Sequence, residues 1–255
     1  MPDFSALDDP YLFWFLSGIC AFAIGFSKNG VVGAGILAVP LMAYIFPAKA
    51  STGILLPMLV GGDIIAVWTF RKHGEWKYIM RALPWALIGI VVGWKVMQIP
   101  SLSADFFKYF IAVTVMAVIV LGEWLAIQRK DEKSLNIPHS IFFAAFFGVL
   151  GGFTTMTANV AGPVFAIYLL SINLPKENFI GSMARIFLIL NVIKIPFSAQ
   201  LGLINYDTLI FNITMLPITM LGAYFGFKTA KIIPQKMFNF AVKILALLAA
   251  IKLLF

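Results

Sequence analysis

The feature that most constrains this sequence is an internal repeat, in which glycines and one polar position recur at a nearly constant spacing. Gly25 recurs as Gly152, 127 positions later, and Gly74 recurs as Gly202, 128 positions later. Further pairs are Gly35 with Gly162, Gly53 with Gly181 and Asp63 with Asn191, followed at a spacing of 133 by Gly89 with Gly222 and Gly93 with Gly226. Matched breakpoints in two apolar halves are typical of secondary transporters.

The composition indicates a membrane protein. Hydrophobic residues make up 61% of the 255 positions and charged residues 12%, whereas soluble domains are about half apolar and about a quarter charged. The net charge of +8 comes from basic residues in short connections between apolar runs. We therefore interpret them as topology signals rather than as a nucleic-acid surface.

The sequence carries none of the common catalytic motifs. No HExxH, Walker or GxSxG pattern occurs, and the glycines from Gly30 to Gly35 precede no strand–helix–strand unit. The single cysteine, Cys20, lies in an apolar run, so an intrachain disulfide is impossible and a metal cluster is not expected. We expect neither an enzyme nor a bound cofactor.

Ten apolar segments are separated by polar residues, prolines and glycines. Most reach the roughly 20 residues that a helix needs to cross about 30 Å of hydrocarbon, so we expect an all-α integral membrane protein. The first two segments of each half are shorter and either span as short helices or enter the membrane as broken, re-entrant half-helices. Backbone bared by such a break should line a cavity. The segments are 11–27, 30–47, 51–70, 78–97, 105–127, 138–153, 158–173, 177–200, 206–227 and 235–255.

Basic residues predict the orientation of the two halves. Connections rich in Lys and Arg should be cytoplasmic, and with five segments per half their distribution predicts two inverted-topology repeats. We expect a multi-pass protein of the cell inner (plasma) membrane with both termini outside, and a homodimer stays open. The basic connections are 71–81, 128–137 and 228–236, and those without Lys or Arg are the N-terminal tail, 98–104 and 200–206. The organisation is a first repeat over 1–127, a cytoplasmic linker over 128–137 and a second repeat over 138–255.

Polar runs at matching breakpoints form the predicted binding site. Ser27 corresponds to Thr154, and Lys28 to Thr155. Glycine lets backbone N–H groups approach a ligand, and hydroxyl, amide and N–H groups at a helix start suit a small oxyanion. Close helix packing is the alternative explanation for the small residues, and extension to the membrane interface for Lys28. The predicted residues are Ser27, Lys28, Asn29, Gly30, Gly33, Gly35, Thr154, Thr155, Thr157, Asn159 and Gly162.

Charged residues inside the segments are further candidates. Asp63, Arg185 and Lys194 lie within apolar segments, where a charge costs on the order of 2.5 to 3.5 kcal/mol on insertion scales, so they should face the interior. Asn191 and Lys194 share a helix face, whereas Arg185, nine residues before Lys194, lies roughly 180° around the helix from it.

Two hypotheses about these charges stay open. In the first, Arg185 or Lys194, with Asn191, attracts an anionic substrate while Asp63 carries a coupling proton. In the second, Asp63 forms a structural ion pair with one of the two basic residues.

At these residues the chain resembles the TauE/SafE family of sulfite and organosulfonate exporters. The motifs that carry the resemblance are GFSKNGVVGAGILAVPLMAYIFPAKASTG in the first half and GGFTTMTANVAGPVFAIYLL in the second. The resemblance covers nearly the whole chain and implies outward movement of sulfite or a related anion. Ala34 stands where the family often has glycine, and Arg185 stands where the similar subgroup has an aromatic residue.

We therefore predict a carrier in the lipid bilayer that moves a small sulfur-containing anion by alternating access, with its site between the repeats. Coupling to a proton or another ion stays open. A carrier of another small organic anion and a passive anion channel are the alternatives, and only a carrier should show counterflow.

Overall fold

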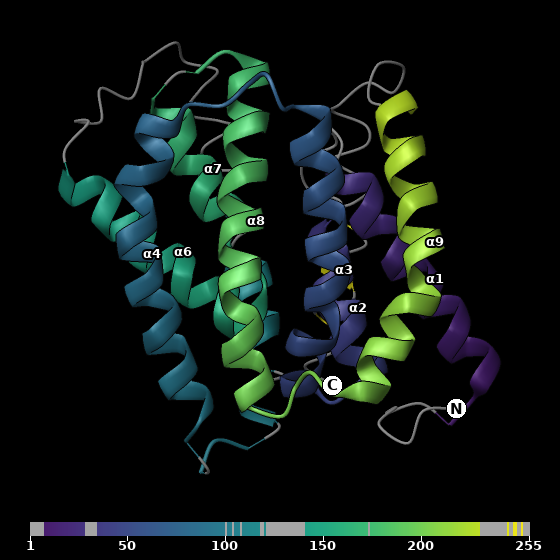
Figure 1. Ribbon diagram of the computed structural model, residues 1–255. Coiled ribbons are helices and arrows are strands. Elements are labelled where there is room, and N and C mark those ends of the chain that lie inside the picture. The colour runs from purple at the N-terminus through teal and green to yellow at the C-terminus, as the bar shows by residue number, and fades with distance from the viewer. Residues whose placement is uncertain are drawn as a thin grey trace.

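Helices account for the secondary structure in the described part of the chain (Figure 1). The computed structural model describes residues 8–28, 35–99, 101–103, 105–107, 109–117, 120, 141–172, 174–229, 244, 247–248 and 251. Its helices are α1 (Pro10–Lys28), α2 (Gly35–Ile45), α3 (Ala48–Thr69), α4 (Trp76–Met97), α6 (Ile141–Ala158), α7 (Gly162–Ser171), α8 (Lys176–Gln200) and α9 (Tyr206–Thr229).

Six of these helices are long and apolar enough to cross a membrane, namely α1, α3, α4, α6, α8 and α9. The 11 residues of α2 and the 10 of α7 rise only about 16 Å and about 15 Å, roughly half of the hydrocarbon thickness. Among the first two segments of each half, only the second is therefore short. The first segments form α1 and α6, which have 19 and 18 residues. The structure confirms an all-α membrane protein.

The break in the second half lies later than the sequence suggested. α6 continues through Ala158, so Thr154, Thr155 and Thr157 lie on a helix rather than in a break. The hydroxyls of Thr154 and Thr157 donate to carbonyl oxygens one turn earlier, each over 2.8 Å, which satisfies them inside the helix. Asn159, with φ at 55°, ends α6 in the left-handed conformation that asparagine tolerates.

Some predicted features lie outside the described residues. These are the breakpoint residues Asn29, Gly30 and Gly33, the linker 128–137, and parts of the segments 105–127 and 235–255.

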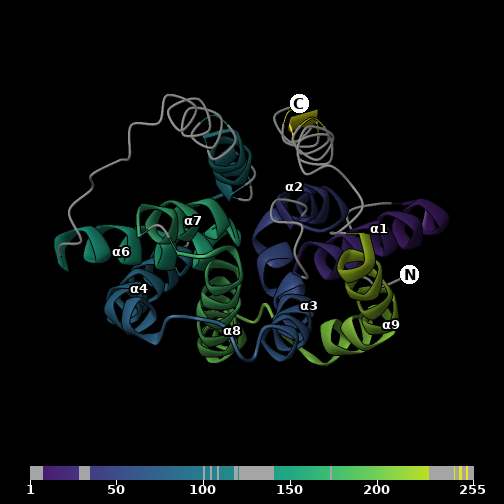
Figure 2. The same cartoon turned by 90° about the horizontal axis from the view of Figure 1, so that it is seen from above.

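The fourth helix of each half, α4 or α9, packs against helices of the other half. α1 packs along α9, and α4 packs along α6. As a result, α4 joins α6, α7 and α8, while α9 joins α1, α2 and α3. Figure 2 shows these two groups side by side, with α3 and α8 in contact between them.

Glycines at repeat-related positions form the closest helix contacts. A Cβ atom on Gly25 of α1 would strike the backbone of Thr219 in α9, and one on Gly152 of α6 would strike the backbone of Ala86 in α4. Ala86 and Thr219 are themselves 133 positions apart, the spacing of the repeat in these helices. The two contacts are copies of one interaction, in which the missing side chain lets two backbones approach closely.

The central helices α3 and α8 are antiparallel. The connection after α3 touches the beginning of α8, where the Glu75 N–H donates to Ser182 Oγ over 2.9 Å. At the other end, Gly53 near the start of α3 packs against Leu203, which follows α8. Because α3 and α8 are repeat mates, their antiparallel contact relates the halves by a two-fold axis perpendicular to the helices, as in an inverted repeat. Below, the α3–α4 end is the end with residues 70–75, and the α8–α9 end is the end with residues 201–205.

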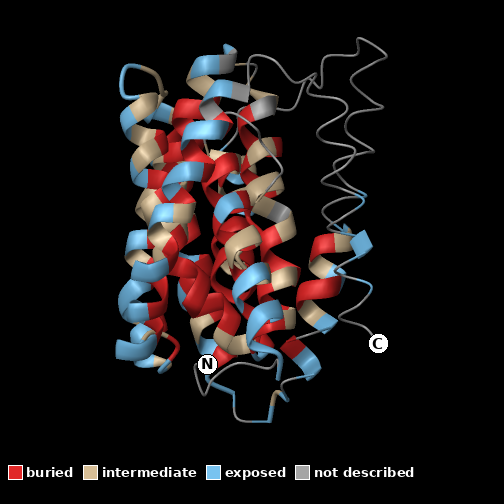
Figure 3. Ribbon diagram, turned by 90° about the vertical axis from the view of Figure 1, so that its right-hand side faces the viewer, coloured by how far each residue is buried: buried red, intermediate tan, exposed pale blue. Residues whose placement is uncertain are grey.

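The outer faces of the helices are apolar. Buried residues lie in the interior and exposed residues lie toward the outside (Figure 3). Large hydrophobic side chains stay exposed there, with Trp68 at 69%, Phe142 at 82% and Ile213 at 68%. Apolar exposure of this extent marks a surface that another apolar phase covers, here the lipid.

The glycine contacts predict a graded response to alanine. Gly25→Ala and Gly152→Ala should each destabilise the protein by about 1–3 kcal/mol, because the added methyl group forces two helices apart. Gly18→Ala is the matched control on α1, since its Cβ would lie 3.7 Å from Ile218 Cδ1, an ordinary contact. Thermal unfolding in detergent measures the differences. Equal stability of Gly18→Ala and Gly25→Ala would contradict the packing described here.

Candidate functional site

A cavity of about 250 Å³ lies where the two short helices begin. Gly35 and Gly162, the first residues of α2 and α7, both line it. A Cβ atom on Gly162 would meet nothing within 4 Å, so the cavity reaches the backbone there. Helix N-termini carry partial positive charge on their free N–H groups. The cavity is therefore bordered by two such termini, one from each half.

Pairs of repeat mates form the centre of the cavity. A residue and its mate lie on opposite sides of the two-fold axis, so a cavity lined by both members of a pair contains the axis. The pairs that line it are Lys28 with Thr155, Gly35 with Gly162, Val39 with Ala166, Leu59 with Phe187 and Asp63 with Asn191.

From this centre the cavity extends toward the α3–α4 end. Ala66 lines it one turn beyond Asp63 on α3, and Ile180 lines it near the beginning of α8. In the opposite direction the helices are packed together. The amide group of Asn159 donates to the Thr52 carbonyl oxygen over 2.8 Å, and that of Asn212 to the Ile54 carbonyl oxygen over 3.0 Å.

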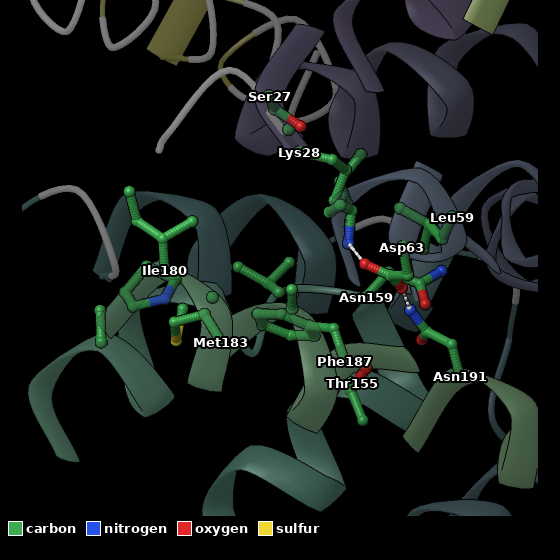
Figure 4. Close-up of a pocket in the computed structure, with 18 residues that line it drawn as sticks. Ser27, Lys28, Leu59, Asp63, Thr155, Asn159, Ile180, Met183, Phe187 and Asn191 are labelled. Carbon is green, nitrogen blue, oxygen red and sulfur yellow. Dashed lines mark hydrogen bonds and ion pairs between the residues drawn. The ribbon is translucent and has the colours of Figure 1, made fainter. Parts of the chain in front are cut away.

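Asp63 is the centre of a buried polar network. Its side chain is 0% exposed, and its Oδ1 atom lies 2.5 Å from Lys28 Nζ. Its Oδ2 atom accepts a hydrogen bond from Asn191 Nδ2 over 2.7 Å. In Figure 4, Lys28 from α1 and Asn191 from α8 reach Asp63 from different sides. Each carboxylate oxygen therefore has a partner, one a cation and the other the repeat mate of Asp63.

The ion pair involves a different base from those that the sequence hypotheses considered. They paired Asp63 with Arg185 or Lys194, whereas the structure pairs it with Lys28. The absence of a side chain at Gly62 explains the geometry. A Cβ atom there would lie 3.0 Å from Lys28 Cγ, so glycine leaves the lysine stem a path along α3.

Lys194 lies directly behind the cavity wall. It is 1% exposed, and its Nζ atom donates to Asn159 Oδ1 over 2.5 Å, to Thr155 Oγ1 over 3.2 Å and to Asn191 Oδ1 over 3.4 Å. All three acceptors are neutral, and no carboxylate of the described residues forms an ion pair with it. With both lysines protonated, the network of Lys28, Asp63 and Lys194 therefore carries one net positive charge.

Arg185 lies away from the cavity, at the α3–α4 end. Its guanidinium group donates to the carbonyl oxygen of His73, and over 2.8 Å to that of Arg71. It also lies 5.8 Å from the centroid of the Trp76 ring. Both acceptors lie in the connection that follows α3, so Arg185 holds this connection against α8.

The other predicted site residues divide into two groups. Ser27, Lys28, Gly35, Asp63, Thr155, Asn159, Gly162 and Asn191 line the cavity. Thr154 and Thr157 are buried and do not line it, because their hydroxyls bond within α6. The described part of the chain holds no group of three His, Cys, Asp or Glu residues that could bind a metal ion.

The apolar wall of the cavity was not predicted from the sequence. Leu59 and Phe187, both in the lining, are repeat mates. Lys28 Nζ lies 4.7 Å from the centroid of the Phe187 ring, close enough for a cation–π interaction. The available signal was spacing, because Leu59 and Phe187 each precede a central polar residue, Asp63 or Asn191, by one helical turn.

The ion pair predicts a strong energetic coupling between Lys28 and Asp63. Lys28→Met and Asp63→Asn should each destabilise the protein, by about 3 kcal/mol if they follow other broken buried ion pairs. The double variant should recover most of that loss, because it leaves no unpaired charge. Detergent-solubilised proteins unfolded by heat provide the four stabilities of the cycle. Additive effects would contradict the ion pair.

Comparison with known proteins identifies the family of the chain. Neither the search of curated proteins nor the search of solved structures returned a match. A family model described as sulfite exporter TauE/SafE matches residues 17–253, which include every helix given above apart from the first turns of α1. The chain therefore belongs to the sulfite exporter TauE/SafE family of membrane transporters.

Proposed function

We propose that this protein exports a small sulfur-containing anion, sulfite or an organosulfonate, by alternating access at the cavity on the two-fold axis. The observation that carries the proposal is the network of two lysines and one carboxylate around that axis. The family supports a transporter of this class.

The charge of the network favours an anion over a cation. Asp63 is already neutralised by Lys28, which leaves a protonated Lys194 without a counter-charge. Burying a charge without a counter-charge is costly, and a bound anion would remove that cost. The amide of Asn159 and the helix N-termini at Gly35 and Gly162 add hydrogen-bond donors of the kind that oxyanions require.

The size and lining of the cavity favour a small amphipathic anion. Its volume of about 250 Å³ lies below the ~300–1,000 Å³ of typical drug-sized sites. Leu59, Met183 and Phe187 add apolar lining beside the polar groups. An oxygen-rich sulfur head with a short organic tail, or sulfite alone, suits such a lining.

The direction in which the cavity extends suits binding of an anion from the cytoplasm. The connection from α3 to α4 and the end of α9 lie at the same end of the molecule (Figure 1). These segments contain Arg71, Lys72, Lys77 and Lys228, whereas Lys49 begins α3 and Lys95 ends α4 at the opposite end. The excess of basic residues marks the α3–α4 end as cytoplasmic. The cavity extends toward that end, so the state described here would accept an anion from inside the cell.

Asp63 is the group that would carry a coupling proton. An anion that approaches Lys28 competes with the Asp63 carboxylate for the same ammonium group. A proton on Asp63 removes that competition, so protonation and anion binding should favour each other.

Thermal stability against a ligand panel tests the substrate class. Sulfite, isethionate, sulfoacetate, taurine, sulfate, acetate and chloride are compared at fixed ionic strength in detergent. A ligand at about a hundred times its dissociation constant should stabilise the protein by roughly 2.7 kcal/mol. We expect sulfite or one of the sulfonates to produce the largest shift. A selective shift with acetate alone would indicate a carrier of another organic anion.

A matched pair of threonines locates the binding site within the same assay. Thr155 lines the cavity and accepts a hydrogen bond from Lys194, whereas Thr157 bonds within its own helix. Thr155→Val should weaken binding of the stabilising anion by roughly tenfold, the effect of one hydrogen bond to a charged group, and Thr157→Val should bind normally. In proteoliposomes, saturation and counterflow of the same anion distinguish a carrier from a channel. Equal binding by the two variants would refute the site.

Anion binding should tighten as the pH falls, because protonation of Asp63 frees Lys28. Isethionate is a suitable probe, since a sulfonate keeps its charge over the range in which sulfite itself takes up a proton. Its dissociation constant is measured by calorimetry across a pH series, in the native protein and in Asp63→Asn. The variant should lose the pH dependence. The same dependence in both proteins would exclude Asp63 as the coupling group.

A further inference from the structure

The cavity is symmetric at its centre but not in its extension. Beyond the axis it is lined by Ala66 of α3 and by Ile180, Met183 and Ala184 of α8, all toward the α3–α4 end. A spacing of 128 relates α3 to α8, as Gly53 with Gly181 and Gly74 with Gly202 show on either side of these positions. The mates of the extension residues, in the same order, are Lys194, Thr52, Leu55 and Leu56.

These four mates are packed into the opposite half of the molecule. Lys194 is 1% exposed, Thr52 4%, Leu55 1% and Leu56 0%, and none of them lines the cavity. They lie on the α8–α9 side of the axis. The part of the molecule that is hollow toward the α3–α4 end is therefore filled at the symmetry-related place.

The duplicated contacts make the reverse arrangement accessible. Gly25 with Thr219 and Gly152 with Ala86 form the same backbone contact in the two groups of helices. Two halves with equivalent packing can exchange their conformations, and the exchanged state then opens toward the other membrane face. In that state the cavity would extend toward the α8–α9 end, and its extension would be lined by Lys194, Thr52, Leu55 and Leu56.

We infer that Lys194 lines the anion pathway in this opposite-facing state and binds the anion there, as Lys28 does in the state described here. The inference rests on the proposed function and assigns to it a second anion-binding residue. It follows from one difference between the two extensions, because the present one has the methyl group of Ala66 where the other has an ammonium group.

The surroundings of Lys194 fit this role. Its ammonium group is held by Thr155, Asn159 and Asn191, and all three of these residues line the present cavity. A single layer of neutral side chains therefore separates Lys194 from the site. An anion that moves past the axis would leave Lys28, which contacts Phe187 and Asp63. It would then bind the ammonium group of Lys194.

Cysteine labelling tests the exchange without depending on the substrate. The chain's one cysteine, the buried Cys20, is replaced by alanine. Two mate pairs are then compared, Ala66→Cys with Lys194→Cys and Ala184→Cys with Leu56→Cys. Lys72→Cys and Tyr206→Cys, both at exposed positions, mark the α3–α4 face and the α8–α9 face. Right-side-out and inside-out membrane vesicles are treated with a charged, membrane-impermeant thiol reagent.

Cysteines at 66 and 184 should react from the face that labels the Lys72→Cys marker, and cysteines at 194 and 56 from the face that labels the Tyr206→Cys marker. Leu56→Cys keeps the test decisive where Lys194→Cys fails to fold, because it changes no charge. Reaction of positions 194 and 56 from the Lys72 face would overturn the inference. So would the absence of reaction from either face in variants that still carry out counterflow.

Sulfite kinetics test the binding role. In oriented vesicles, Lys194→Gln should raise the half-saturating sulfite concentration by roughly tenfold or more at the α8–α9 face (the Tyr206 face), because one hydrogen bond to a charged group is lost. The change at the α3–α4 face (the Lys72 face) should be smaller. Lys28→Gln should show the reverse preference. Equal effects of Lys194→Gln at both faces would overturn the binding role. If sulfite is not carried but the labelling divides between the faces, the substrate assignment fails and the exchange stands.

Discussion

The hydrogen bond between Asn191 and Asp63 is the interaction on which the rest of the site depends, because it joins α3 to α8 at the two-fold axis. Symmetry brings a residue on the axis against its own mate. Two carboxylates at this place would repel each other unless they shared a proton, and two amides would leave Lys28 without a counter-charge. One Asp and one Asn avoid both penalties. They also fix the site's remaining polar groups, since Asp63 holds Lys28 and Asn191 contacts Lys194.

The same network connects structure with transport. A membrane interior tolerates charge only where partners surround it, and here the partners of the two lysines are unequal. Lys28 has a carboxylate, whereas Lys194 has only neutral acceptors. With Lys194 protonated, the site therefore lacks one negative charge. A molecule that supplies it would stabilise the interface between the two groups of helices, so that occupancy and conformation become linked.

Much of the fold could be predicted from the sequence, because a repeat of glycines and a hydrophobic pattern are local properties of the chain. The pairing of Lys28 with Asp63 could not, since the two residues lie on different helices and only packing brings them together. The position of the second break was also misplaced. Threonines look like a polar interruption in the sequence, but the hydroxyls of Thr154 and Thr157 bond to their own helix and extend it to Ala158. Arg185 and Lys194 were alternatives for the same role, and the structure separates them because the loop after α3 provides carbonyl groups for Arg185 that no sequence pattern shows.

The exchange of the fourth segments between the halves has a consequence for how the chain is made. α1 enters the membrane before the other described helices during synthesis, but its glycine face packs against α9, and Thr219 follows its partner Gly25 by 194 positions. At translation rates of about 5–20 residues per second, α1 waits roughly 10 to 40 s for that partner. Throughout this time its small-residue groove is open to lipid and to other helices. α4 and α6 lie much closer in sequence, so their group of helices can assemble first and offer a template against which α1 and α9 later close.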